Sequence, residues 1–299
     1  MSQEPRFGRM IPAMVTPLDQ NREPDFERAQ QLAVRLVDGG SDALVVCGTT
    51  GESPTLSHAQ KARLFACTKE AVGGRVPVIA NVGGNCTRDS IDFAREAESL
   101  GVDGLMCVVP YYNKPPQEGL YRHFRAIAEA VELPVMLYNI PGRCVVNMEA
   151  ETTLRLARQC ANVVAVKEAS GKMDQVRAIV AGAPEGFAVY SGDDAATCDV
   201  MEAGGVGVVT TTGNVAPGRM KEIVDLCAAG AWDEARAASE RLMPLMEGLF
   251  ETANPILVKE ALKLAGFPVG GVLLPLVDAT EEQSSRLAGI MREVGVLEA

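Results

Sequence analysis

NVVAVKEASG, residues 162–171, joins an apolar run to a single lysine, Lys167. Residues 163–166 carry no polar side chain, which is typical of a strand buried on both faces of a sheet. Burial disfavours the charged form of lysine and can lower its pKa until the free amine is available as a nucleophile. Lys167 is therefore a candidate for Schiff-base catalysis. The structural alternative is an ion pair with its neighbour Glu168.

Seven further apolar runs alternate with helical patterns along the chain. The eight predicted strands are residues 10–16, 43–47, 77–82, 104–109, 134–139, 163–167, 187–191 and 206–210. The predicted helices include residues 25–37, 57–72, 87–100, 117–131, 148–160 and 217–229, with another opening at Asp193-Asp194. Units of roughly 25–30 residues are typical of repeated βα pairs, and eight such pairs close a barrel. The sequence therefore predicts an α/β fold, a TIM (β/α)8 barrel over residues 1–230.

The remainder of the chain, residues 231–299, is predicted to be a C-terminal helical extension. Residues 232–252, 256–265 and 280–294 read as helices whose Leu- and Met-rich faces require a surface to pack on. Since no Pro/Gly/Ser-rich linker divides the chain, we expect one barrel domain with this appendage.

The charge and the cysteines limit the possible function classes. A net charge of −11 opposes binding to nucleic acid or to an anionic membrane, because both need a basic face. No apolar run approaches the ~18 residues of a membrane span, and the N-terminus MSQEPRFGRM lacks the apolar segment of a signal peptide. The eight cysteines form no CxxC pair and only two histidines are present, so we expect free thiols, no zinc site and a cytoplasmic location.

Polar residues follow five of the predicted strands. In chain order they are Gly48-Thr49-Thr50-Gly51-Glu52, Pro110-Tyr111-Tyr112-Asn113, Tyr138-Asn139 with Arg143 soon after, Lys167-Glu168, and Ser191-Gly192-Asp193-Asp194. Because the chemistry of a TIM barrel lies at the carboxyl ends of its strands, we expect these residues to share one mouth.

A Schiff-base enzyme needs an amine, a proton shuttle and donors for the substrate carboxylate. Tyr138, on the strand beside Lys167, is the candidate shuttle. The hydroxyls and backbone N–H groups of residues 48–51 are suited to a carboxylate, and Arg143 to a second anion in bidentate geometry.

Each of these groups also has a purely structural alternative. Tyr138 could be a packed tyrosine, residues 48–51 a plain strand-to-helix turn, and Arg143 an arginine that touches no ligand. Tyr111-Tyr112, at another strand end, could be an interface pair. The glycine-rich residues 204–207 precede a strand and lack the third glycine of a dinucleotide-binding loop, so we expect no dinucleotide site there.

Five motifs, in this order, resemble those of the N-acetylneuraminate lyase family of class I aldolases, and in particular its dihydrodipicolinate synthase branch. They are GTTGES at 48–53, VPYYNKP at 109–115, LYNIPGR at 137–143, VKEASG at 166–171 and SGDDA at 191–195. The resemblance runs from Phe7 to beyond residue 260. It implies a TIM barrel with a C-terminal helical extension, assembled as a cytoplasmic homotetramer, a dimer of dimers, without metal or organic cofactor.

The resemblance implies that the chain condenses pyruvate with L-aspartate 4-semialdehyde in the diaminopimelate route to lysine. Lys167 forms the Schiff base with pyruvate, and Tyr138 is the general acid/base. Thr49 and Tyr112 complete a proton relay, in which Tyr112 reaches the site of the neighbouring subunit. The substrate-binding residues are Thr50 and Val209 for pyruvate, the latter through its backbone, and Arg143 for the carboxylate of the semialdehyde. Gly192 is a further substrate-binding residue.

Three alternatives to this function stay open. Another aldolase of the same family would cleave sialic acid or a 2-keto-3-deoxy sugar acid, and would be expected to show more polar side chains where this chain has Arg143. A pyridoxal-phosphate enzyme using Lys167 would need a phosphate cup and would absorb near the visible range. An inactive binding barrel would lack a catalytic group, and none is missing.

The resemblance also points to a regulatory site. In members inhibited by lysine, the feedback site at the dimer interface uses residues that match His58, Asn85 and Tyr111. Those members have a glutamate at the position of Asp89 and a second histidine at the position of Lys61. Because Asp89 is shorter and Lys61 adds a positive charge, we predict weak or absent inhibition by lysine.

Overall fold

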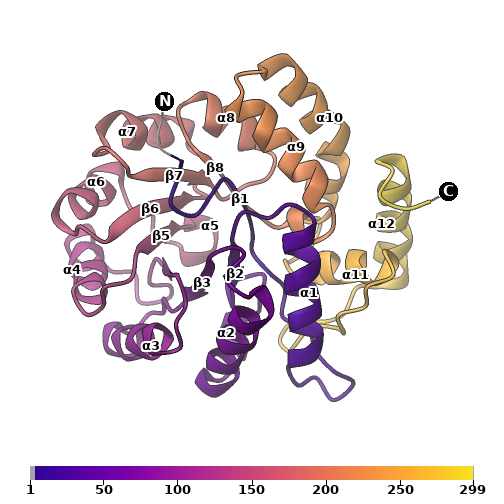
Figure 1. Cartoon of the computed structure of the whole chain (residues 1–299), viewed down its shortest axis with the longest axis horizontal. Helices are drawn as coiled ribbons and strands as arrows, with labels where there is room; N and C mark the ends of the chain where they lie inside the picture. The colour runs from indigo at the N-terminus through magenta and orange to yellow at the C-terminus, as the bar shows by residue number, and fades with distance from the viewer. Residues whose placement is uncertain (1–3, 299) are drawn as a thin grey trace.

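A ring of eight parallel strands forms the centre of the molecule (Figure 1). The structure, a computed structural model, describes residues 4–298. The strands are β1 (Met10–Pro12), β2 (Leu44–Val46), β3 (Val78–Asn81), β4 (Gly104–Val108), β5 (Val135–Asn139), β6 (Val163–Glu168), β7 (Ala188–Ser191) and β8 (Gly207–Thr210). The sheet order is β1-β8-β7-β6-β5-β4-β3-β2, and a single parallel bridge between Ala13 and Val45 joins β1 to β2. The predicted TIM barrel is confirmed.

Helices follow the strands and cover the outside of the ring (Figure 1). They are α1 (Phe26–Asp38), α2 (His58–Val72), α3 (Thr87–Ser99), α4 (Gln117–Ala128), α6 (Ala150–Gln159), α7 (Met173–Gly182), α8 (Thr197–Glu202) and α9 (Pro217–Ala228). Local sequence explains where several begin. Ser57 and Gln60 form a capping box at the start of α2, and the Asp25 carboxylate accepts a hydrogen bond from Arg28 N at the start of α1.

The structure departs from the predicted elements in three places. Asp193-Asp194 does not open a helix, because α8 begins at Thr197. The Asp194 carboxylate instead accepts from the backbone N–H groups of Thr211 and Thr212. A short helix, α5 (Pro141–Cys144), follows β5, and two 3-10 turns, η1 (Ser53–Thr55) and η2 (Thr212–Asn214), follow β2 and β8; none was predicted. The first strand is shorter than residues 10–16, since the chain leaves the sheet after Pro12.

The strands bury both faces, and successive residues alternate between two apolar clusters. One cluster lies between the strands and the helices. The other fills the inside of the barrel and consists of Phe7, Ile11, Ala13, Ala43, Val45, Ile79, Met106, Met136, Tyr138, Ala165, Ala188, Tyr190 and Val209. Since Ala165 points inward, the same alternation directs Lys167 inward from β6.

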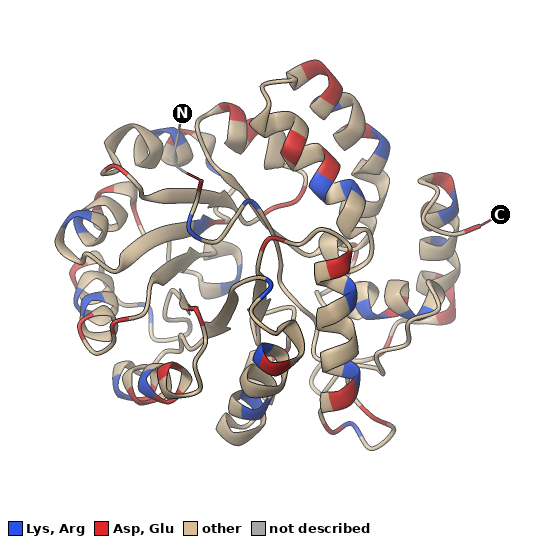
Figure 2. Ribbon diagram, in the orientation of Figure 1, with Lys and Arg blue, Asp and Glu red and all other residues tan. Residues whose placement is uncertain are grey.

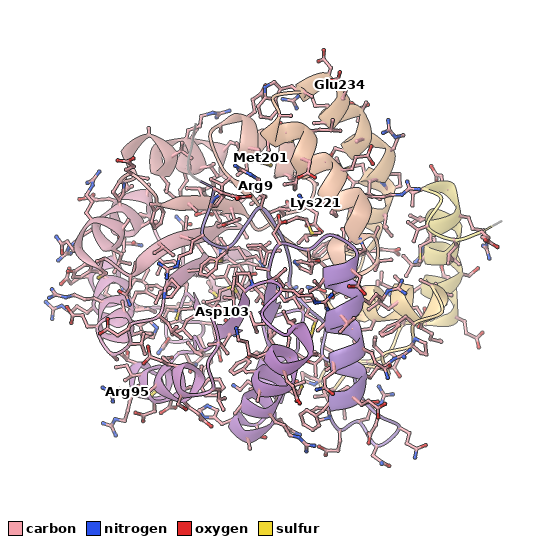
Figure 3. All side chains as sticks on the ribbon, in the orientation of Figure 1. Arg9, Arg95, Asp103, Met201, Lys221 and Glu234 are labelled. Atoms are coloured by element: carbon pink, nitrogen blue, oxygen red, sulfur yellow. The ribbon has the colours of Figure 1, made fainter. Side chains whose placement is uncertain are left out.

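Charged groups lie at the N-terminal ends of several strands, opposite the predicted mouth. The Arg9 guanidinium donates to Val206 O at 3.0 Å, just before β8, and Asp42 accepts from the backbone N–H groups of Arg9 and Met10. Asp103, just before β4, accepts from Val78 N at 2.8 Å (Figure 3). Elsewhere acidic and basic residues are interspersed along the outer helices, and few lie on the strands (Figure 2).

The C-terminal part contains α10 (Trp232–Gly248), α11 (Ile256–Leu264) and α12 (Glu281–Glu293), with α11 beside α1 and α12 in contact with α10 and α11 (Figure 1). Gly230 separates α9 from α10, at the predicted boundary, while the division into two units stays a prediction. Within residues 4–298, every helix is too short or too polar to cross a bilayer. All eight cysteines are free, as expected.

Candidate active site

Lys167 lies inside the barrel, between two tyrosines of the adjacent strands. The register pairs Lys167 with Tyr138 on β5 and with Tyr190 on β7. The lysine is 6% exposed, and its Nζ lies 4.3 Å from the centroid of the Tyr138 ring. Gly192 packs against the lysine stem: a Cβ there would lie 3.1 Å from Lys167 Cε, so only glycine fits without a shift. The amine and the phenol are therefore held together at the end of β5 and β6.

The surroundings of Lys167 favour its uncharged form. Burial lowers the pKa of Lys167 to about 8, with Arg143 acting in the same direction and the carboxylate of Asp194 opposing it. Among the residues that the structure describes, no carboxylate forms an ion pair with this amine. The uncharged amine is thus far more available for nucleophilic attack near neutral pH than that of a lysine with the ordinary pKa of 10.5.

Glu168, the alternative partner of Lys167, has other contacts. Its carboxylate accepts from Asn139 Nδ2 at 3.1 and 3.2 Å, from Gln175 Nε2 at 3.0 Å and from Ser170 N at 2.8 Å. Asn147 extends this network by accepting from Asn139 Nδ2 at 2.9 Å. Glu168 therefore fixes the ends of β5 and β6 and does not pair with Lys167.

Tyr138 is protonated over the physiological pH range. Burial raises the pKa of Tyr138 to about 12, although a hydrogen bond with Thr49 and the charge of Arg143 lower it. Thr49, Tyr111 and Tyr138 line a narrow cavity of about 60 Å³. Thr49 and Tyr138, two members of the predicted relay, are thus in contact within one chain.

A larger cleft of about 740 Å³ opens over the same strand ends. Its lining includes Arg143 from α5, Gly192 and Asp193 after β7, and Glu247 and Phe250 near the end of α10. Arg143 is exposed, and its guanidinium is the basic group of this lining. The cleft can accept an anionic second substrate beside the buried amine.

Asp194 was missed as a site residue. It is buried, and its Oδ2 accepts from Thr211 N at 3.1 Å and Thr212 N at 2.7 Å, while its Oδ1 has no partner among residues 4–298. It thereby ties the end of β7 to the turn after β8, near the backbone of Val209. The only signal in the sequence is the acidic pair itself, which local rules interpret as a helix start.

Taken with the fold, this arrangement points to one family. A model of the dihydrodipicolinate synthetase family matches residues 6–294. The chain belongs to this family.

Individual relatives in the family are close to the chain over its whole length. The 4-hydroxy-tetrahydrodipicolinate synthase of Symbiobacterium thermophilum is 55% identical, over 98% of this chain and 100% of that protein. The structure of DHDPS from Cyanidioschyzon merolae with lysine bound has 45% identity and a TM-score of 0.97, covering 98% of this chain and 100% of that one. The chloride-inhibited dihydrodipicolinate synthase of Acinetobacter baumannii, complexed with pyruvate, has 36% identity, a TM-score of 0.95 and coverage of 97% and 100%. All three are synthases, so the sugar-aldolase alternative is not favoured.

Tyr112 is the one predicted catalytic residue of the dihydrodipicolinate synthetase pattern that the fold of a single chain keeps out of the site. Its side chain is 88% exposed, and its backbone has a positive φ of 75°. Tyr111, beside it, is half-buried and lines the narrow cavity with Tyr138. Tyr112 therefore points away from the Lys167 of its own chain.

The predicted regulatory residues lie on α2, on α3 and in the loops before α3 and after β4. His58 stacks on Phe93 with ring centroids 4.6 Å apart, and Lys61 Nζ lies 4.9 Å from the same ring. Asp89, in the first turn of α3, is exposed, and Asn85 O accepts from Asn113 Nδ2 at 2.8 Å. Tyr111, the fifth predicted regulatory residue, also lines the narrow cavity beside Thr49 and Tyr138.

Proposed function

We propose that Lys167 carries the 4-hydroxy-tetrahydrodipicolinate synthase activity of this chain, forming a Schiff base with pyruvate that condenses with L-aspartate 4-semialdehyde. The observation that carries the proposal is a buried amine with its pKa lowered to about 8, in contact with the ring of a buried tyrosine at the mouth of the barrel. The name of the relative from Symbiobacterium thermophilum and the pyruvate in the Acinetobacter baumannii structure support it. Reduction with borohydride in the presence of pyruvate, followed by peptide mapping, tests it.

The residues at the site suit each step of the condensation. The neutral amine of Lys167 adds to the keto carbon of pyruvate, and Tyr138 transfers protons as the resulting hydroxyl leaves as water. Loss of a methyl proton gives an enamine, whose carbon attacks the aldehyde of the second substrate. The amino group of that substrate then displaces the Lys167 nitrogen, which closes the ring and frees the enzyme.

The two substrate carboxylates are assigned to separate places. The Gly48–Gly51 turn with Thr50, Gly192 and the backbone of Val209 binds pyruvate beside Lys167. Arg143, in the open cleft, binds the carboxylate of L-aspartate 4-semialdehyde with two parallel N–H···O bonds. The buried position of Thr50 and the exposed position of Arg143 support this division.

Arg143→Ala is expected to leave the pyruvate adduct intact and to raise the KM for the semialdehyde by roughly 10–100-fold, the worth of a charge-assisted hydrogen bond. Steady-state kinetics with each substrate varied, together with borohydride trapping, measures both effects. Arg143→Lys keeps the charge and loses the bidentate geometry. Its KM for the semialdehyde should therefore lie between that of the unsubstituted enzyme and that of Arg143→Ala. An equal loss of pyruvate trapping in Arg143→Ala would contradict the separation of the two binding places.

We propose that the chain functions in the cytoplasm as a homotetramer built as a dimer of dimers, in which Tyr112 completes the site of a neighbouring subunit. The exposed side chain of Tyr112 supports this assembly. Mixing Tyr112→Phe subunits with Lys167→Ala subunits is expected to restore activity, because one site of each mixed pair keeps both groups. Each variant mixed with itself is the control. Verified hybrids without any recovery would contradict an intersubunit relay.

L-Lysine is expected to inhibit this enzyme weakly or not at all. Lys61 adds a positive charge near an inhibitor that carries two ammonium groups, and like charges about 4 Å apart cost roughly 1 kcal/mol in water and ~4 kcal/mol near a protein surface. Asp89 is one methylene shorter than the glutamate of lysine-inhibited members, so its carboxylate reaches less far towards an ammonium group of the inhibitor. Initial rates measured across a lysine titration check this expectation, and the Lys61→His, Asp89→Glu double variant should gain sensitivity. Strong inhibition of the unsubstituted enzyme at sub-millimolar lysine would contradict it.

A further inference from the structure

Two buried side chains of the loop at residues 48–52 contact the C-terminal part of the chain. Thr50 is 2% exposed and Glu52 is 4% exposed. Asn254 Nδ2 donates to Thr50 Oγ1 at 2.9 Å across 204 positions of sequence, and Lys259 Nζ donates to Glu52 Oε1 at 2.8 Å across 207. Lys259, on α11, is itself 2% exposed. The loop is therefore held by residues that belong to the helical extension.

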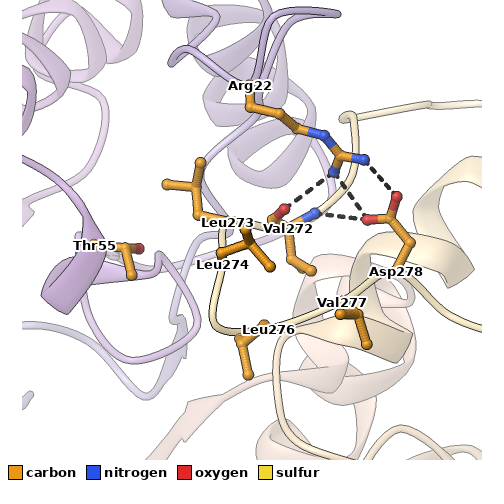
Figure 4. Close-up of a pocket in the computed structure, with 8 residues that line it drawn as sticks. All are labelled: Arg22, Thr55, Val272, Leu273, Leu274, Leu276, Val277 and Asp278. Carbon is orange, nitrogen blue, oxygen red and sulfur yellow. Dashed lines mark hydrogen bonds and ion pairs between the residues drawn. The ribbon is translucent and has the colours of Figure 1, made fainter.

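The second oxygen of Glu52 is held by the same part of the chain. Glu52 Oε2 accepts from Leu273 N at 2.7 Å. The segment that contains Leu273 is fixed in turn by Asp278, which accepts from Val272 N and from the Arg22 guanidinium, both at 2.9 Å (Figure 4). Both carboxylate oxygens of Glu52 are thus bound by groups that follow α10.

The contact with Asn254 leaves the hydroxyl hydrogen of Thr50 free to donate to a ligand. A threonine hydroxyl has one hydrogen to donate and two lone pairs to accept with. Because Thr50 Oγ1 accepts from Asn254, its own hydrogen is free, and within residues 4–298 it donates to no other group. A substrate carboxylate is the acceptor that this hydrogen suits.

The backbone of the loop needs external support. Cys47, just before the loop, and Glu52, its last residue, have positive φ values of 55° and 56°, in the left-handed region that non-glycine residues rarely occupy. Such conformations persist where the surroundings determine them. The contacts of Glu52 with Lys259 and Leu273 supply that support.

We propose that Asn254 and Lys259 are positioning residues for pyruvate, holding the loop so that the Thr50 hydroxyl donates to the pyruvate carboxylate. The inference rests on the proposed function, since it takes pyruvate as the ligand of this loop. It assigns to the helical extension a part in binding the first substrate, in addition to packing on the barrel.

The sharpest test is Asn254→Asp, which replaces the NH₂ donor with an acceptor of nearly the same shape. The Thr50 hydrogen is then drawn to the aspartate and lost to pyruvate. The pyruvate concentration for half-maximal borohydride trapping at Lys167 is expected to rise about 10-fold or more, the range of a hydrogen bond to a charged group. The KM for L-aspartate 4-semialdehyde is expected to stay within about 2-fold, since no additional hydrogen bond is lost there.

The second test is Lys259→Met, with Lys263→Met, an exposed lysine one turn later on α11, as the matched control. Lys259→Met leaves Glu52 as an unpaired buried charge, which can prevent folding. In that case the double variant Lys259→Met, Glu52→Gln, which removes both charges, is tested in its place. In either variant the half-saturating concentration of pyruvate is expected to rise several-fold, and the control is expected to match the unsubstituted enzyme.

The outcomes separate the two proposals. Absence of a pyruvate adduct at Lys167 in the unsubstituted protein would overturn the proposed function itself. A normal adduct in that protein, combined with unchanged half-saturation by pyruvate in Asn254→Asp and in the variants of Lys259, would overturn the positioning role alone. A lower Tm with unchanged half-saturation would also overturn that role, because it shows a purely structural contact.

Discussion

Lys167→Ala is expected to abolish borohydride trapping of pyruvate and to lower turnover by roughly 10⁴-fold or more, as removal of a covalent nucleophile does in other enzymes. Lys167 is buried inside the barrel with its Nζ against the Tyr138 ring, and without this amine no Schiff base forms at the site. Mass spectrometry of the reduced protein and steady-state rates measure the two effects. Lys172→Ala, an exposed lysine five positions later, is the control and should trap pyruvate normally. Substantial trapping at a different lysine would refute the assignment.

The pH dependence of trapping tests the same assignment in the unsubstituted enzyme. Only the neutral amine attacks pyruvate, so the rate should rise with pH and level off above the pKa of Lys167. Because burial lowers that pKa to about 8, half of the maximal rate is expected near pH 8. A rate that keeps rising towards pH 10.5, the ordinary pKa of a solvated lysine, would show that the amine is not desolvated as the structure indicates.

Tyr138→Phe is expected to lower kcat by about 10²–10⁴-fold, the usual contribution of a general acid/base. The ring that packs beneath Lys167 remains, so the protein should fold and bind pyruvate, and slow formation of the trapped adduct should account for the loss. Single-turnover trapping rates compared with kcat test this expectation.

The matched control is Tyr190→Phe, inside the same barrel. The Tyr190 hydroxyl donates to Gly8 O at 2.8 Å, at the N-terminal end, so its removal costs about 1 kcal/mol of stability and should spare catalysis. Equal losses of kcat in the two variants would show that Tyr138 acts through packing.

The sequence was sufficient to predict the barrel and the groups at its mouth, because both depend on local patterns. An apolar run followed by a polar residue marks a strand and its end, and eight such runs place Lys167, Tyr138 and the Gly48–Gly51 turn on one face. The roles of Asp194, Asn254 and Lys259 depend on distant partners. Asp194 binds amides 17 and 18 residues later, and no local rule distinguishes this from a helix start.

Lys259 shows the same limit in a helix. A lysine on an amphipathic pattern normally lies on the solvated face, yet this one is buried against Glu52. The reason is the packing of α11 against the loop after β2, which only the assembled fold reveals. The short helix α5, four residues long, lacks the length that a helical period needs to be recognised.

The single Ala13–Val45 bridge makes the joint between β1 and β2 the seam of the ring. A barrel opens most easily where its hydrogen-bond ladder is thinnest, because local opening there breaks the fewest bonds. Thr50, the proposed pyruvate ligand, lies in the loop that follows β2, so local opening at the seam would move it relative to the amine on β6. Through Asn254 and Lys259 the C-terminal part of the chain braces the loop that follows β2, on one side of this seam, and under the proposed positioning role that brace would steady the pyruvate site.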